Sequence, residues 1–273
     1  MEIRDWRLKK SLISNLQSPI MAAFRVLTYN LYFGGTDRLE EIYTVLAHVG
    51  ADIIGLTEAD DPAVVAALAA RLGLHHIWAE GSGDRHIATL SRYPIAEWQI
   101  YRTPPLTQAV LETKLALPNG AISVYNAHFL PTLLLPFEVR RWQAVGRLLQ
   151  VIQSRRPGAH LIMGDLNAIA RGDRVLQRNN PARMRRLMAL QLNMIFRLAL
   201  PRLLKAGYTD CFRLLHPHAD GFTWMPGNLT TRYDYILADP AMAARLQTCR
   251  VIDDIEAVCT ASDHLPLLAE FKL

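Results

Sequence analysis

The sequence contains no long hydrophobic run. No apolar stretch reaches the roughly 18 residues that a membrane-spanning helix needs, which argues against a transmembrane segment. The charged start of the chain is also not followed by the apolar core of a signal peptide. Because Met21 lies just before the first expected strand, we expect residues 1–20 to be an extension ahead of a true start at Met21, or else a helix packed on the body.

Cysteine is scarce as well. The three cysteines, Cys211, Cys249 and Cys259, show neither metal-ligand spacing nor a paired framework. We expect small buried thiols in a reducing cytoplasm, with a disulfide left open as the alternative. Linkers, low-complexity tracts and internal repeats are also lacking. The 273 residues, 51% of them hydrophobic, can bury a large core, so we expect one domain over residues 21–273, or at most two domains.

Short apolar runs with strand-like patterns make up much of what is present. Helical spacing of apolar residues predicts helices over 37–48, 62–72 and 137–152, and Pro118-Asn119-Gly120 predicts a hairpin turn. This mixture predicts an α/β fold in which two mixed β-sheets pack together with helices outside. The expected strands are 24–31, 52–56, 75–78, 87–91, 95–101, 110–117, 121–125, 160–163, 233–237, 248–252 and 265–271.

Six polar blocks follow or border these apolar runs. Each carries a carboxylate, carboxamide or imidazole where a buried strand should reach the rim of a sheet. One such ending means little, since strands often stop at Asn, Asp or Gly. Six together supply oxygen ligands for a hard cation and a His–carboxylate pair for proton transfer, which metal-assisted hydrolysis of phosphate esters requires. The blocks are Thr28-Tyr29-Asn30, Thr57-Glu58, Asn126-Ala127-His128, Gly164-Asp165-Leu166-Asn167, Arg232-Tyr233-Asp234-Tyr235 and Ser262-Asp263-His264.

Two spacings within these blocks carry specific expectations. Asp165 and Asn167 lie two apart on an extended segment, so their side chains share a face and can orient a water and a phosphate oxygen. The alternative is a turn in which Asp165 caps backbone N–H groups. Asp263 and His264 are adjacent and therefore serve different partners. Asp234 is expected to bind the second nitrogen of His264 and to fix its tautomer.

The ordered set of blocks resembles the endonuclease/exonuclease/phosphatase superfamily from about Phe24 to the C-terminus. The most specific part is Gly-Asp165-Leu-Asn167 followed about a hundred residues later by Ser-Asp263-His264. The resemblance implies a four-layer α/β sandwich with the site at one rim. The Asn126–Phe129 block resembles the branch of deoxyribonucleases, sphingomyelinases, deadenylases and 5-phosphatases rather than abasic-site endonucleases, which have a Tyr in the comparable role.

The resemblance also implies roles. Glu58 would be the main metal ligand with Asn30 beside it, and Asp263 would help to hold the metal or a bridging water. His128 would donate to a phosphate oxygen, and either Asp165 or His264 would accept the proton of the attacking water. Four carboxylates repel a phosphate, so a divalent cation, Mg²⁺ or Mn²⁺, is needed on electrostatic grounds too. Arg232 is a further candidate for binding phosphate, with a solvated arginine as the alternative.

Positive charge is concentrated in residues 171–205, which we call the basic segment. It holds nine basic residues and one acidic residue, a local charge of +8, so that the rest of a chain of net charge +5 carries −3. Apolar residues from Met184 to Leu198 recur at helical spacing, with Pro181 expected to open the helix and Pro201 to end or kink it. Such a helix suits a nucleic-acid backbone, an anionic membrane surface, or simple packing on the body.

These expectations define a divalent-metal-dependent hydrolase of phosphate esters. Nucleic acid is the expected substrate, because the family often acts on it and the basic segment has the matching charge. The alternative is a phospholipid or inositol-phosphate headgroup. A third hypothesis, a catalytically inactive binding module on the same fold, is weakened because every block is intact.

Overall fold

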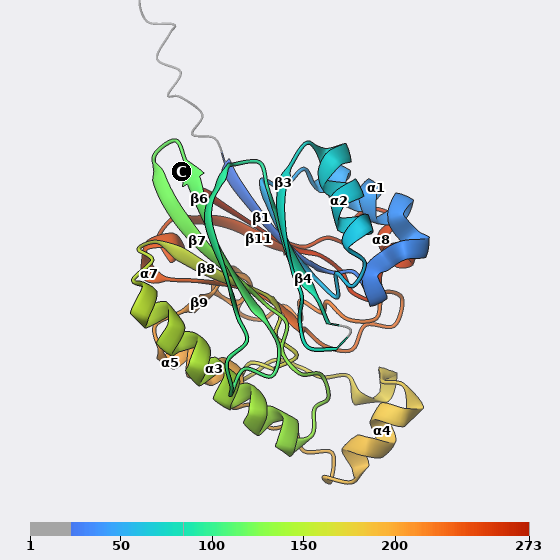
Figure 1. Ribbon diagram of the computed structural model, residues 1–273. Coiled ribbons are helices and arrows are strands. Elements are labelled where there is room, and N and C mark those ends of the chain that lie inside the picture. The colour runs from blue at the N-terminus through green and yellow to red at the C-terminus, as the bar shows by residue number, and fades with distance from the viewer. Residues whose placement is uncertain (1–22, 84, 273) are drawn as a thin grey trace, which may run out of the picture.

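In the computed structural model, which describes residues 23–83 and 85–272, twelve strands form two six-stranded sheets (Figure 1). The expected N-terminal extension lies outside the described residues. The first sheet contains β1 (Ala23–Asn30), β2 (Ile53–Thr57), β3 (His75–Ala79), β4 (Ile87–Ser91), β11 (Leu246–Val251) and β12 (Leu267–Lys272). Its strand order is β11-β12-β1-β2-β4-β3, and β1 and β2 run parallel.

The second sheet also has six strands. It contains β5 (Ile95–Tyr101), β6 (Val110–Leu117), β7 (Gly120–Ala127), β8 (His160–Asp165), β9 (Thr209–Asp210) and β10 (Asp234–Ala238). Its order is β5-β6-β7-β8-β10-β9, and β7 and β8 run parallel. The expected hairpin joins β6 to β7 at Pro118-Asn119.

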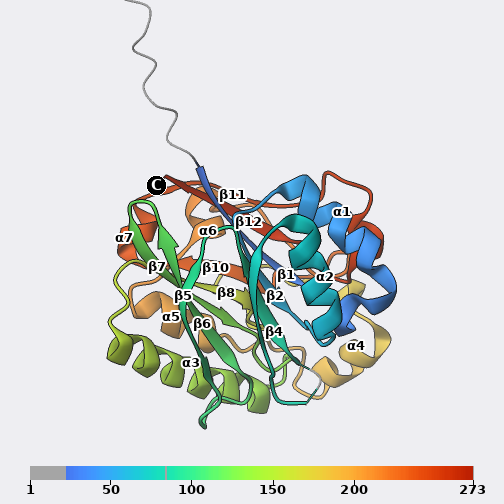
Figure 2. The ribbon, with the colours of Figure 1, turned by 45° about the horizontal axis from the view of Figure 1, so that its top comes forward.

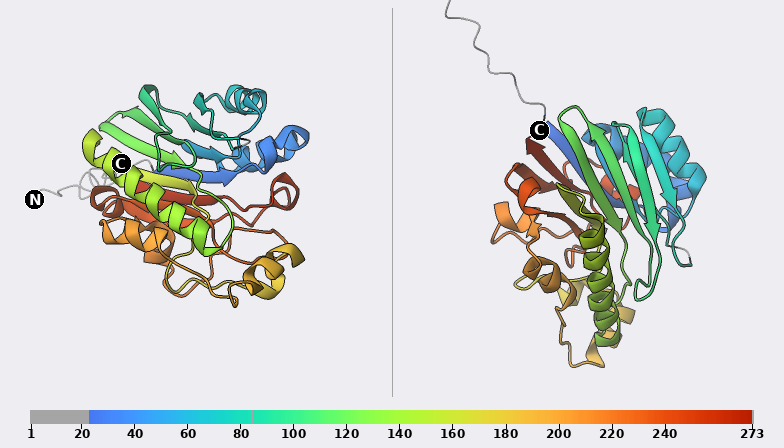
Figure 3. Two further views of the ribbon diagram at one scale, coloured as in Figure 1. Left: turned by 60° about the horizontal axis from the view of Figure 1, so that its bottom comes forward. Right: turned by 60° about the vertical axis from the view of Figure 1, so that its left-hand side comes forward.

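Helices cover the outer faces of both sheets (Figures 2 and 3). Apolar side chains of α1 (Leu39–Val49), α2 (Pro62–Leu72) and α8 (Val258–Ala261) form one core with the first sheet, and α3 (Leu135–Arg155) and α5 (Ala199–Lys205) form another with the second. A third core, with Phe24, Ile53 and Met163, joins the two sheets. The predicted α/β sandwich is therefore confirmed. The other helical segments are η2 (Phe33–Arg38), η3 (Gln177–Asn179), α4 (Ala182–Ala189), α6 (Cys211–Leu215) and α7 (Pro240–Ala243).

Several strands are buried on both faces. All five residues of β2, of β4 and of β10 are buried, which explains why these strands appear in the sequence as unbroken apolar runs. The helix predicted over 62–72 has the expected bounds, because Asp61 caps it and Pro62 occupies its first turn. No helix among residues 23–83 and 85–272 is both long and apolar enough to cross a membrane.

The basic segment differs from its expected form. The single helix predicted there is wrong: α4 ends at Ala189, Leu192 and Asn193 adopt left-handed backbone angles, and α5 starts at Ala199. Pro201 neither ends nor kinks a helix. It lies in the first turn of α5, where a missing N–H costs nothing. Of the cysteines, Cys211 and Cys249 are buried as expected, whereas Cys259 is exposed, and all three thiols are free.

Candidate active site

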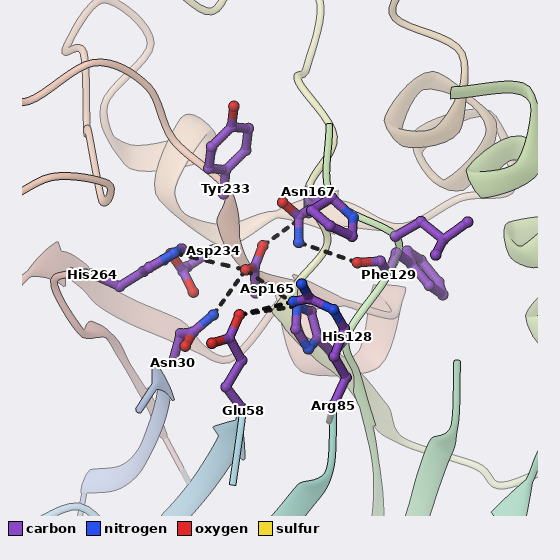
Figure 4. Close-up of polar contacts among 12 residues, drawn as sticks. Asn30, Glu58, Arg85, His128, Phe129, Asp165, Asn167, Tyr233, Asp234 and His264 are labelled. Atoms are coloured by element: carbon purple, nitrogen blue, oxygen red, sulfur yellow. Dashed lines mark hydrogen bonds and ion pairs between the residues drawn. The ribbon is translucent and has the colours of Figure 1, made fainter. Parts of the chain in front are cut away.

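The polar strand ends meet at one rim of the sandwich (Figure 4). Asn30 ends β1 and Glu58 follows β2 in the first sheet, while Asp165 ends β8 in the second. Because β10 runs antiparallel to β8, its first residue, Asp234, pairs directly with Asp165. The two sheets are thus joined at this rim by a hydrogen bond from Asn30 Nδ2 to Asp165 Oδ2 of 3.0 Å.

A turn after β8 holds Asp165 and Asn167 together. Asp165 Oδ1 accepts a hydrogen bond of 2.9 Å from the Asn167 backbone N–H, and Asn167 Nδ2 donates to the carbonyl of Phe129 at 3.1 Å. Gly164 permits the close approach of β8 to the end of β7, since a Cβ there would lie 1.9 Å from the Ala127 carbonyl oxygen. Asp165 therefore caps a backbone N–H, and Asp165 and Asn167 both line one pocket. Their roles toward a water and a phosphate oxygen stay a prediction.

His264 and Asp234 form a buried ion pair. His264 Nδ1 lies 2.7 Å from Asp234 Oδ2, the pairing expected from the sequence, and His264 Nε2 lies 3.8 Å from Asp165 Oδ2. Burial by itself lowers the pKa of His264, but the carboxylates of Asp234, Asp165 and Asp263 outweigh it and raise that pKa to about 10. His264 therefore holds its proton at neutral pH.

Burial has the opposite consequence for Asp165. It raises the pKa of the Asp165 carboxyl to about 7, with Asp234 and Glu58 adding to the effect and His264 opposing it. A carboxyl that titrates near neutral pH is suited to accept and release protons in the working range of an enzyme.

Glu58 leaves β2 in a left-handed conformation, with a φ of 48°. Its Oε2 accepts a hydrogen bond from the Phe33 backbone N–H at 3.0 Å, and its Oε1 lies 3.0 Å from Arg85 Nη1. A non-glycine residue held in this region is a mark of functional sites, where surrounding contacts impose the geometry. Here the contacts come from Arg85 and from the loop after β1.

His128 lies behind these groups. It is fully buried, and its Nε2 is 3.6 Å from Asp165 Oδ2 and 3.9 Å from Glu58 Oε1. Burial lowers the pKa of His128 to about 3, against the attraction of Glu58, so the ring is neutral. Neither ring nitrogen has a hydrogen-bond partner. A neutral ring can still donate one N–H toward the site, which keeps the predicted role open.

The site opens into a pocket of about 190 Å³. Glu58, Asp165, Asn167, Asp263 and His264 line it, as the sequence led us to expect. Several other lining residues were not predicted as site residues from the sequence. Most of them lie on loops, whose position no periodic pattern predicts, while Phe33 starts η2 and Met184 lies on α4. For Arg85 the one available signal was its place just before a buried strand. The lining residues not singled out from the sequence are Tyr32, Phe33, Arg85, Pro131, Thr132, Met184, Trp224 and Tyr233.

The expectation that Arg232 binds phosphate is wrong. Its side chain is fully buried and does not line the pocket. The guanidinium instead binds Asp173 Oδ2 at 2.8 Å and Asp210 Oδ2 at 2.6 Å. The alternative of a solvated arginine is wrong for the same reason. The arginine that lines the pocket is instead Arg85.

The donors at the rim fit a hard divalent cation. Among the described residues no group of three His, Cys, Asp or Glu side chains forms a metal cluster, so the fit rests on mixed oxygen donors. Glu58 and Asp263 offer carboxylates and Asn30 a carboxamide oxygen, the donor types that Mg²⁺ takes alongside water. Within the part of the chain that the structure describes, Asp263 Oδ1 and Asp234 Oδ1 are buried without a hydrogen-bond partner, a costly state that a nearby cation would relieve.

Comparison with known proteins identifies the family. The model of the endonuclease/exonuclease/phosphatase family matches residues 27–264. The chain belongs to this family. It is therefore a phosphoester hydrolase, as predicted from the polar blocks.

Individual relatives are distant but cover nearly the whole chain. Exodeoxyribonuclease III of Haemophilus influenzae is 26% identical over 258 residues, 86% of this chain and 95% of that protein. A 3′ phosphatase from Neisseria, solved bound to a product DNA hairpin, is 23% identical with a TM-score of 0.69 over 92% of this chain and 100% of its own. An AP endonuclease from Archaeoglobus fulgidus is 22% identical, with a TM-score of 0.70 and the same coverage.

These likenesses establish the fold but do not assign the chain to one branch of the family. Exodeoxyribonuclease III and an AP endonuclease are among the relatives, although the His128 block led us to expect the other branch. At such low identity the structural likeness carries no substrate with it, so the branch stays a prediction.

Proposed function

We propose that this family member is a divalent-metal-dependent phosphodiesterase that acts on nucleic acid. The observation that carries the proposal is the convergence of Glu58, Asp165, Asp263 and the His264–Asp234 pair on one pocket. Asp165 can act as a base, protonated His264 supplies a positive charge, and the carboxylates supply hard oxygen donors within one site. Hydrolysis of an unreactive phosphate ester demands such a combination.

The side chains divide the work by their protonation states. Asp165, with a pKa of about 7, takes the proton of the attacking water. His264, which stays protonated, donates from Nε2 to a phosphate oxygen as negative charge builds there, and Asp234 holds the ring through Nδ1. Asn167 and Arg85 orient the phosphate from the pocket wall. A Mg²⁺ or Mn²⁺ ion held by Glu58, Asp263 and Asn30 would supply charge neutralisation and an acidified water.

Nucleic acid is supported as the substrate from two directions. The family includes exodeoxyribonuclease III, and a protein of the same fold was solved with a DNA hairpin. In addition, Arg183, Arg185 and Arg186 are exposed on α4, within one helical turn of Met184 in the pocket wall. Exposed arginines beside a phosphate site suit a long anionic chain that runs past it.

The test is a panel of end-labelled DNA and RNA substrates in Mg²⁺. It includes single strands, recessed 3′ ends, 3′-phosphates and abasic sites, each repeated with EDTA and with the Asp165→Asn protein. Cleavage that both controls abolish supports the proposal and excludes an inactive binding module. Folded protein that cleaves nothing in the panel would refute it.

One observation favours a second candidate, hydrolysis of a phospholipid headgroup. The turn after α4 exposes Leu190 and Leu192 to 80% and 81%, with Met194 half exposed. Apolar tips flanked by arginines are typical of proteins that rest on anionic membranes. Co-sedimentation with phosphatidylserine liposomes, compared with a Leu190→Ser/Leu192→Ser variant, tests it. Binding that the variant loses, together with lipid turnover, would favour this candidate.

A further inference from the structure

The loop after β1 has an unusual backbone. Tyr32, Phe33, Gly34 and Gly35 all have positive φ angles, of 53°, 52°, 78° and 71°. Glycine adopts such angles freely, but a bulky aromatic residue there is a genuine outlier whose backbone is strained. Two aromatic outliers in succession need a local reason.

The site itself holds this conformation. The Tyr32 N–H donates to Asn30 Oδ1 at 2.8 Å, and the Phe33 N–H donates to Glu58 Oε2 at 3.0 Å. The Gly34 N–H donates to the Glu58 carbonyl at 2.9 Å, and the Arg38 guanidinium donates to the Tyr32 carbonyl. The loop is therefore tied to two candidate metal ligands, and its position is fixed relative to the phosphate site.

The rings are left open to solvent at the pocket. Tyr32 is 41% and Phe33 63% exposed, and both residues line the pocket with Asp165 and His264. Their ring centroids are 4.8 Å apart and the rings are tilted by 58°, so one base can stack on one ring only. Arg38 lies over the Tyr32 ring at 5.3 Å and braces it, so Phe33 offers the larger free face. Exposed aromatic surface beside a catalytic pocket is typical of a ligand-binding surface.

We propose that the Phe33 ring, supported at its side by Tyr32, forms a stacking platform for the nucleobase next to the scissile phosphate. This rests on the proposed function and adds a base-binding subsite to it. A flat apolar face suits any base, because every base has a π-face, so the platform favours nucleotides over other phosphate esters without reading sequence. The strained backbone fixes the distance between the platform and the groups that act on phosphorus.

The decisive experiment compares two oligonucleotides that differ only in the base beside the scissile phosphate. One carries the base, and the other carries a tetrahydrofuran residue at that position with the same phosphates. The variant is Tyr32→Asn/Phe33→Asn, because asparagine tolerates left-handed angles and the loop can keep its shape without the rings. Trp98→Ala is the matched control, since Trp98 is 52% exposed on β5 and does not line the pocket.

We expect the double variant to lose on the order of 10- to 100-fold in kcat/KM on the base-bearing strand, the range that loss of one stacked base implies. On the tetrahydrofuran strand its loss should be small, and Trp98→Ala should match wild type on both. A second readout is independent of turnover: 2-aminopurine beside the scissile phosphate should be quenched on binding to Asp165→Asn protein, and less so when the two rings are also removed.

Each other outcome overturns the platform. An equal loss on both strands would show that the loop acts only on the metal ligands or the fold. An unchanged 2-aminopurine signal would show that no base stacks there. A loss confined to phospholipid vesicles would assign the rings to a membrane surface instead. If wild type cleaves no nucleic acid at all, the proposed function fails first, which distinguishes its failure from that of the platform alone.

Discussion

The molecule contains two clusters of acidic side chains that differ in how their charge is balanced. In the first, which we call the arginine cluster, Asp173 and Asp210 face Arg232 and Arg213. Both oxygens of each carboxylate accept hydrogen bonds, from Arg213 and Arg232, at 2.6–3.1 Å. Charges and hydrogen bonds are complete without any further group.

The second is the site cluster at the rim. When all four carboxylates are ionised, Glu58, Asp165, Asp234 and Asp263 carry four negative charges, against the single positive charges of Arg85 and protonated His264. Among the described residues, two buried carboxylate oxygens of this cluster have no hydrogen-bond partner. In that ionised state the deficit of two positive charges equals the charge of one divalent cation. Incomplete balance thus distinguishes a reactive site from a structural ion-pair network of similar burial.

Removal of divalent metal should reduce turnover more than any of the substitutions discussed below. We expect EDTA to reduce turnover to background and Mg²⁺ or Mn²⁺ to restore it, because the site cluster lacks two positive charges without the ion. The arginine cluster needs no ion, so the circular dichroism spectrum should stay unchanged. Full turnover in protein shown by elemental analysis to be metal-free would contradict the assignment.

Substitution of His264 tests whether the site cluster takes part in the chemical step. His264→Ala should reduce kcat on the order of 10²–10⁴-fold, as expected for loss of a positioned proton donor. His76→Ala is the matched control, because His76 is exposed on β3, away from the pocket. A loss of less than about tenfold would remove His264 from the chemistry.

Substitution of Arg232 tests whether the arginine cluster serves stability and not substrate binding. Arg232→Met leaves Asp173 and Asp210 buried with too little positive charge, which should cost about 3–5 kcal/mol of unfolding free energy. Urea denaturation measures this cost, and the folded fraction should keep its KM. If stability were unchanged while KM rose, Arg232 would bind the substrate after all, as the sequence alone had indicated.

Arg232 also shows which parts of the molecule could be predicted. The strand ends at Asn30, Glu58 and Asp165 were recognisable because buried strands have a strong pattern and parallel strands deliver their ends to one rim. A side chain next to such an end carries no signal for its direction, so Arg232 was assigned to the wrong cluster. Its partners Asp173 and Asp210 are distant in sequence.

Loops were the least predictable part. Arg85 and Phe33 are held at the pocket by long-range hydrogen bonds to Glu58 that no local pattern encodes, and Tyr32 by a hydrogen bond to Asn30, two residues away. In the basic segment, apolar spacing favoured one helix between Pro181 and Pro201. Tertiary hydrogen bonds to Glu138 Oε1 from the N–H groups of Leu198 and Ala199 instead start a new helix there.

The smallest predicted effect compares Asp263→Asn with Asp173→Asn in EDTA. Burial raises the pKa of the Asp263 carboxyl, with His264 and Trp224 opposing and Glu58 and Asp234 adding. The folded state thus binds this proton more tightly than the unfolded state, and ionised Asp263 destabilises the fold increasingly as the pH rises above about 4. Asparagine is never charged, and its oxygen can still accept the hydrogen bond of Trp224 Nε1, which is 3.2 Å in the native protein.

Asp263→Asn should therefore raise the unfolding free energy at pH 8 by up to about 1 kcal/mol, a figure reduced because the side chain is a third exposed. Asp173→Asn should lower it, because Arg232 and Arg213 lose a charged acceptor. Mg²⁺ should stabilise wild type more than Asp263→Asn, by mass action on the intact site. Thermal unfolding with and without Mg²⁺ measures all three. Destabilisation by both substitutions in EDTA would mean that the site cluster is as complete as the arginine cluster, and the argument for a missing cation would fail.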